Sequence, residues 1–218
     1  MAAATGLRRG ASGSAVKALC VFVHGRGQSP EEMESHVLKR LWATNVAFAL
    51  PRAPRGAWYD AKAVDPISST TRAQLEEALG LIGDEIAALR ADYPGLPLLL
   101  AGFSQGACLS LEYVCRGQDA PDALAALTGC RVGTTSCDRP LAAPADLPVY
   151  LSGSDADPWI PVTASAEAML ELGRQKLQLR TDLFPGRGHE VSPPEIAMLE
   201  TMLTDLGNGH KPRFNATR

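Results

Sequence analysis

The stretch best suited to chemistry is Gly102-Phe103-Ser104-Gln105-Gly106, in which a glycine lies two residues from the serine on each side. An apolar run, 97–101, precedes it, and a helix-like segment, 107–115, follows it. A G-x-S-x-G pattern between a strand and a helix is typical of a tight turn that exposes a nucleophilic serine. Glycines are needed because side chains at those positions would collide with the neighbouring strand or helix. The pattern therefore predicts that Ser104 is a nucleophile at a helix N-terminus, where backbone N–H groups favour negative charge.

A serine hydroxyl is a poor nucleophile at neutral pH, so it needs a base, and the base needs a partner that fixes its tautomer. His189 is the candidate base, because it follows a predicted strand in a glycine-rich loop; the alternative is a loop histidine with no chemical task. Asp157 is the candidate acid, in a segment that also follows a strand. Asp155 is the competing acid, and otherwise it would cap or shape the loop. The chain order serine, aspartate, histidine is one in which such triads occur.

A tetrahedral oxyanion needs two preorganised N–H donors. The backbone of Gln105 is the first candidate, because it follows the nucleophile. The second is the backbone of Arg26, in the His24-Gly25-Arg26-Gly27-Gln28 loop after an apolar strand. We expect His24 itself to be structural.

Two tryptophans are candidates for the substrate pocket. Trp58 lies in a long, proline-containing loop, residues 51–71, and Trp159 lies beside the candidate acid. Loops of that length inside a compact domain are usually functional or disordered. Either indole could line an acyl pocket, and ordinary packing under a loop is the alternative for both.

The elements that must hold these residues alternate between strands and helices. Apolar or alternating runs predict strands at 18–23, 46–50, 97–101, 124–130, 148–152 and 177–183, the last near a sheet edge. Helices are expected over 30–42, after caps at Thr71 and Ser192, and over 107–115 and 162–172. This alternation predicts the α/β class: a mostly parallel sheet with helices on both faces, in one domain spanning 1–218. We expect 1–15 and 208–218 to be loosely ordered, with a short N-terminal strand or hairpin as the alternative.

Composition narrows the function classes. The net charge of −3 gives no electrostatic case for nucleic acid, and no apolar run approaches the length of a membrane-spanning helix. No signal peptide is recognisable, so cytoplasmic residence is the default expectation. The five cysteines and four histidines show no metal-binding spacing, so we expect free thiols and no metal.

Five short sequence blocks follow one another along the chain: Val23-His24-Gly25-Arg26-Gly27-Gln28, Trp58-Tyr59-Asp60, Gly102-Phe103-Ser104-Gln105-Gly106-Ala107, Asp155-Ala156-Asp157-Pro158-Trp159-Ile160-Pro161 and Gly188-His189. In these blocks the chain resembles the phospholipase/carboxylesterase family of α/β-hydrolases, which includes acyl-protein thioesterases. The resemblance implies an α/β-hydrolase fold, a Ser104–Asp157–His189 triad, an oxyanion hole from Arg26 and Gln105, no cofactor and frequent homodimers. The short segment 131–147 argues against a large cap domain. At 129–133 the chain departs from the Ser-Gly pair that the family often has there.

The resulting functional prediction is a serine hydrolase that cleaves carboxylic esters through an acyl-enzyme on Ser104. Small-molecule esters, lysophospholipids and thioesters are all compatible substrates. Two alternatives stay open at the level of sequence. One is a non-catalytic binding module with the same fold. The other is an acyltransferase that passes the acyl group to an alcohol instead of water.

Overall fold

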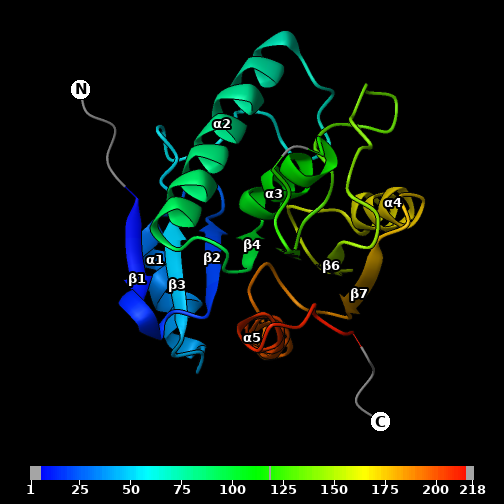
Figure 1. Ribbon diagram of the computed structural model, residues 1–218. Helices are drawn as coiled ribbons and strands as arrows, with labels where there is room; N and C mark the ends of the chain where they lie inside the picture. The colour runs from blue at the N-terminus through cyan, green and yellow to red at the C-terminus, as the bar shows by residue number, and fades with distance from the viewer. Residues whose placement is uncertain (1–5, 118, 215–218) are drawn as a thin grey trace.

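A computed structural model describes residues 6–117 and 119–214 (Figure 1). Seven strands form a single sheet in the order β1-β3-β2-β4-β5-β6-β7, in which β1 is antiparallel to β3 and all other neighbours are parallel. The strands are β1 (Leu7–Gly10), β2 (Ala18–Val23), β3 (Val46–Leu50), β4 (Leu98–Phe103), β5 (Ala123–Leu127), β6 (Pro148–Ser154) and β7 (Gln178–Phe184).

The strand sequences explain their places in the sheet. Every residue of β2, β3, β4, β5 and β6 is buried, which matches the continuous apolar runs of the first four and of the first half of β6. In contrast, β7 has no buried residue and lies at an edge, as its alternating pattern predicted. The predicted strand over 124–130 ends earlier, at Leu127, because Thr128 adopts a positive φ of 54° that turns the chain away.

Helices cover both faces of the sheet (Figure 1). On one face α2 (Ser69–Asp92), α3 (Gln105–Cys115) and α4 (Val162–Gly173) contribute to one core cluster. On the other face, α1 (Pro30–His36), the following 3-10 turn (Leu38–Arg40) and α5 (Pro193–Gly207) pack against the second cluster. No helix in the described parts of the chain combines the length and apolarity needed to span a bilayer.

Two predicted helix boundaries were wrong. The cap of α2 is Ser68, whose side chain accepts from Thr71 N, so Thr71 lies inside the helix. The helix after Ser29 ends at His36, and Trp42 is 87% exposed, although its spacing had placed it on the apolar face. The cap at Ser29 and the capping box at Ser192 are both present.

The chain ends differ in part from expectation. Residues 7–10 are ordered as the edge strand β1, so loose order was wrong there and the alternative of a short strand is confirmed. Residues 208–214 form neither helix nor strand. The remainder of both predicted loose segments, 1–5 and 215–218, lies outside the described residues. Residues 131–147 also contain no helix or strand, which leaves no cap domain at this point.

Candidate active site

Ser104 lies at the sharp turn between β4 and α3. Its backbone has φ 56° and ψ −120°, an unfavourable conformation for a residue with a side chain. Two glycines make the turn feasible, because α3 passes very close to the strands. A Cβ on Gly106 would lie 2.1 Å from the Val23 carbonyl oxygen, and one on Gly102 would lie 2.5 Å from the Gly106 backbone. The backbone N–H of Ser104 donates to the Leu127 carbonyl at 3.0 Å, which fixes the turn against the end of β5.

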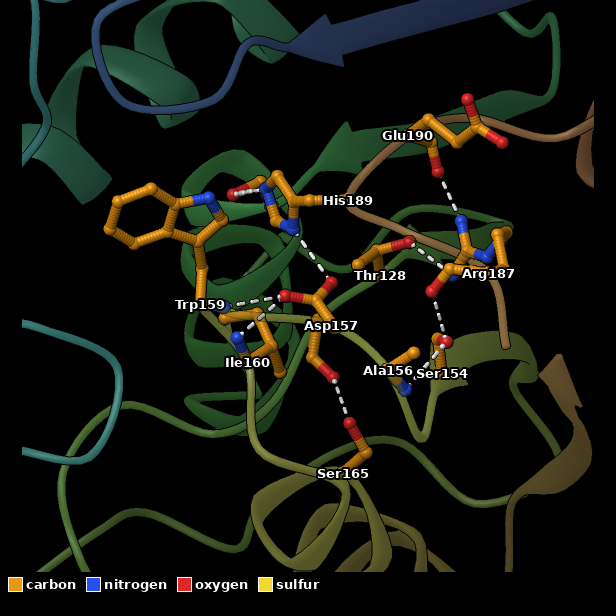
Figure 2. Close-up of polar contacts among 12 residues, drawn as sticks. Thr128, Ser154, Ala156, Asp157, Trp159, Ile160, Ser165, Arg187, His189 and Glu190 are labelled. Carbon is orange, nitrogen blue, oxygen red and sulfur yellow. Dashed lines mark hydrogen bonds and ion pairs between the residues drawn. The ribbon is translucent and has the colours of Figure 1, made fainter. Parts of the chain in front are cut away.

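The structure brings Ser104, His189 and Asp157 into one hydrogen-bonded row. Ser104 Oγ lies 2.8 Å from His189 Nε2, and His189 Nδ1 lies 2.7 Å from Asp157 Oδ2. The other carboxylate oxygen, Oδ1, accepts from the backbone N–H groups of Trp159 and Ile160 at 2.7 and 2.9 Å (Figure 2). The Asp157 side chain is fully buried, whereas the imidazole is 17% exposed. The carboxylate is therefore fixed in place, and the imidazole can be reached from solvent.

The geometry also separates the two candidate acids. Asp157 belongs to the acid loop, residues 155–161, and is the one that meets His189. Asp155 points elsewhere: its Oδ1 accepts from Gly186 N at 2.7 Å. Gly186 lies in the histidine loop, residues 185–192, so Asp155 holds the two loops together, as the alternative role for it predicted.

The two predicted oxyanion donors adjoin residues next to the serine: Gln105 follows Ser104 in the chain, and Arg26 follows Gly25. A Cβ on Gly25 would lie 3.2 Å from Ser104 Cβ, so the loop after β2 passes directly against Ser104. Within the described parts of the chain, the backbone N–H groups of Arg26 and Gln105 donate to no acceptor. Two free N–H groups beside one hydroxyl form an arrangement able to receive an anionic oxygen.

The side chains of those same residues hold the loop over 51–68. Arg26 Nη2 donates to the carbonyls of Tyr59 and Ala61 at 2.9 and 2.5 Å. Gln105 Nε2 donates to Tyr59 O at 2.7 Å, and its Oε1 accepts from Trp58 N at 3.0 Å. The long loop is thus held against the turn at Ser104 and the loop after β2 by these two polar side chains. The sequence had suggested a role only for the backbone N–H groups of the same residues.

Trp58 corrects a sequence prediction. The residue is 1% exposed, so it offers substrate no surface. Its Nε1 donates to His24 O at 2.8 Å, and its ring lies 5.0 Å from the His24 ring. His24 is buried as well: Nε2 accepts from Ala53 N at 3.1 Å, which leaves Nδ1 to donate to Gly25 O at 2.7 Å. Desolvation by burial lowers the pKa of His24, so the neutral imidazole is favoured and serves the scaffold of the loop.

A groove beside the imidazole provides room for a ligand. It has a volume of about 390 Å³, which is within the range of small-molecule sites. Its wall includes His189 and Phe103, whose rings are 5.0 Å apart, and it extends to α1. The remaining lining residues are Gln28, Met33, Ser35, His36, Val37, Arg40, Glu190 and Val191. Sequence reasoning missed this groove because its walls come from three separate segments. Trp159, the second predicted pocket residue, is 70% exposed and lies next to the buried acid.

Among the residues described, no three or more His, Cys, Asp or Glu side chains lie together in a way that could hold a metal ion. All five cysteines are free, as expected, and four of them are buried.

Comparison with known proteins agrees with this architecture. The model of the phospholipase/carboxylesterase family matches residues 10–206. A similar solved structure is the phospholipase/carboxylesterase from Dyadobacter fermentans, with 29% identity, a TM-score of 0.80, and coverage of 92% of this chain and 96% of that one. Esterase PE8 is 25% identical, with a TM-score of 0.76 and coverage of 93% and 98%. Acyl-protein thioesterase 1 from Neurospora crassa is 23% identical over 86% of each chain. This chain therefore belongs to the phospholipase/carboxylesterase family and is a serine hydrolase with the α/β-hydrolase fold.

Proposed function

We propose that this chain hydrolyses carboxylic esters through an acyl-enzyme formed on Ser104. The observation that carries the proposal is the row of two hydrogen bonds, 2.8 Å from Ser104 Oγ to His189 and 2.7 Å from His189 to Asp157. In the first step Ser104 Oγ attacks the ester carbonyl while neutral His189 Nε2 takes the hydroxyl proton. Asp157 fixes the tautomer of His189 and stabilises the imidazolium that forms.

The developing oxyanion is received by the free backbone N–H groups of Arg26 and Gln105. Removal of one such donor typically costs about 3 kcal/mol of transition-state stabilisation. His189 then donates its proton to the leaving alcohol, which departs on the side of the groove. Water, deprotonated by the same imidazole, then attacks the acyl-enzyme. The bond between the acyl carbon and Ser104 Oγ breaks, His189 returns the proton to Oγ, and the carboxylic acid is released.

The substrate class follows from the openness of the site. Residues 131–147 form no helix or strand and contribute nothing to the walls of the groove, so we expect it to accept esters with varied alcohol portions beside His189. Among relatives, one carries the name acyl-protein thioesterase and another phospholipase/carboxylesterase, so thioesters and lysophospholipids are the classes to test after simple esters.

The test is labelling with a fluorophosphonate probe, which reacts with activated serines. Folded protein is expected to form one adduct, on Ser104, and the Ser104→Ala variant none. Ser136→Ala removes an exposed serine and should label like the parent. An adduct that survives Ser104→Ala would rule out the assignment. A series of p-nitrophenyl esters from acetate to palmitate then measures the preferred acyl length.

A further inference from the structure

Two charged side chains are buried directly beneath the histidine loop. Arg187 lies in that loop, two residues before His189, and Glu195 lies in the first turn of α5. Their side chains are 7% and 0% exposed, and Arg187 Nη1 donates to Glu195 Oε2 at 2.9 Å. Burying two charges carries a large desolvation cost. The proposed reaction uses neither side chain, so their presence calls for another reason.

Arg187 holds the chain on both sides of His189. Its Nη1 also donates to the Glu190 carbonyl, and its own carbonyl accepts from Ser154 Oγ (Figure 2). Ser154 Oγ in turn accepts from Ala156 N, at the start of the acid loop, at 3.2 Å. The residues that flank His189 are therefore joined to one another and to the loop that carries Asp157.

Glu195 connects the same arginine to the sheet. Its Oε2 accepts from both the backbone N–H and the hydroxyl of Ser192, each at 2.7 Å. Its Oε1 accepts from the hydroxyls of Ser152, in β6, and Thr128, just after β5. The carboxylate thus links α5, β6 and the end of β5, with every bond received by a buried oxygen.

Thr128 continues the network to the serine turn. Arg187 Nη2 donates to Thr128 Oγ1 at 2.8 Å, and Thr128 N donates to Ser152 Oγ at 2.8 Å. The neighbouring carbonyl, of Leu127, accepts from Ser104 N at 3.0 Å. One ion pair is therefore connected to the segments that carry Ser104, Asp157 and His189.

We propose that Arg187 and Glu195 are positioning residues that hold the imidazole of His189 between Ser104 and Asp157. The inference rests on the proposed function, since it assigns the pair to the reaction at Ser104. Its physical reason is the geometry of proton transfer, in which a misplacement of about 1 Å can cost on the order of 100-fold in rate. Arginine suits the task because its planar fork donates to three acceptors at fixed angles, which the single ammonium of a lysine cannot reproduce.

The test compares variants that differ in charge balance. Arg187→Lys keeps the charge beside Glu195 but loses the fork, and the double variant Arg187→Met/Glu195→Met removes both charges together. The matched control is the double variant Arg131→Met/Glu112→Met. Arg131 and Glu112 form another buried ion pair, 2.7 Å apart with side chains 1% and 3% exposed, whose bonds go to residues outside the histidine and acid loops.

The readouts are kcat and KM for p-nitrophenyl acetate, the melting temperature, and the downfield proton resonance of the His189–Asp157 hydrogen bond. Arg187→Lys is expected to melt near the parent temperature, to lose on the order of 10-fold to 100-fold in kcat with little change in KM, and to lose or broaden that resonance. The double variant at 187 and 195 should lose kcat and the resonance in the same way, and it should also melt at a lower temperature, because Ser192, Ser152 and Thr128 lose a buried acceptor. The control pair should lower the melting temperature and leave kcat per folded molecule and the resonance unchanged.

Two outcomes would overturn the proposal. One is a folded Arg187→Lys protein with parental kcat and an intact resonance. The other is a loss of kcat in the control as large as that at Arg187, which would assign the effect to general stability. The resonance can be measured without turnover, so it tests the positioning of His189 even if the parent has no esterase activity. A failure of the proposed function can therefore be distinguished from a failure of this inference.

Discussion

At the scale of single residues, the site depends on groups held by several bonds each. The carboxylate of Asp157 is buried and accepts from two backbone N–H groups besides His189, so its position owes little to the flexibility of its own side chain. His189 differs from Asp157 in that it is partly exposed, and it is held by one hydrogen-bond partner at each ring nitrogen.

Replacing the acid by its amide tests this arrangement. Asp157→Asn keeps the shape but can donate from its amide to His189 Nδ1, which favours the wrong tautomer of the imidazole. We expect kcat to fall by about 10³-fold to 10⁴-fold with little change in KM. Asp146→Asn, at an exposed turn with positive φ that asparagine tolerates, is the control. A kcat for Asp157→Asn close to that of the control would contradict the proposed role.

His24 makes stability depend on pH. Burial lowers its pKa below the ordinary value of 6.5, so the unfolded chain binds a proton more readily than the folded one. The stabilisation by neutral His24 is therefore present above about pH 6.5 and is lost progressively as the pH falls. Melting temperatures of the parent and His24→Gln, measured from about pH 8 to 5, should converge on acidification. A constant gap between the two curves over that range would disprove this linkage.

At the scale of elements, the critical feature is the close approach of α3 to the strands that precede it. The turn at Ser104 works because glycine on both sides lets helix and strand backbones touch. Once that contact is made, α3 begins directly after Ser104, so its first N–H groups lie next to the site of the proposed oxyanion.

Two glycine-to-alanine variants separate this packing from helix propensity. Gly106→Ala places a Cβ 2.1 Å from the Val23 carbonyl, and a backbone clash of this kind should cost more than about 3 kcal/mol of unfolding free energy. Gly80→Ala, in the exposed middle of α2 with open space around it, should instead stabilise by about 0.5–1 kcal/mol. Urea denaturation measures both, and equal effects would refute the packing argument.

At the scale of the whole molecule, the parallel sheet gathers distant segments at one edge. The loops after β2, β4, β6 and β7 carry the two proposed oxyanion donors, Ser104, Asp157 and His189, because the carboxyl ends of parallel strands lie together. The groove beside His189 arises at the same edge, where α1 meets the histidine loop.

Narrowing the groove should change leaving-group selectivity. Ser35 is exposed and lines it, so Ser35→Trp is expected to lower kcat/KM for 1-naphthyl acetate by on the order of 10-fold or more, and for ethyl acetate by less than about 3-fold. Thr201→Trp, on the exposed side of α5, adds the same side chain away from the groove as a control. An equal loss for both esters would show that the leaving group lies elsewhere.

Sequence by itself determined the positions of the six strands β2 to β7, apart from the end of β5, together with the turn at Ser104 and the order of its partners. These are local properties: continuous apolar runs predict buried parallel strands, and two glycines around a serine predict a tight turn. The misplaced boundary at Thr71 and the exposed Trp42 show the limit of periodicity, since capping and packing decide where a helix begins and ends.

Only the tertiary structure decided which side chains meet. His189 contacts Ser104 across 85 positions in sequence, and Asp157 rather than Asp155 faces it because of how two loops lie against each other. The burial of Trp58 and the ion pair of Arg187 with Glu195 depend on the same long-range packing. Hydrophobic periodicity carries information over a few neighbouring residues, whereas these contacts depend on the register and closure of the whole sheet.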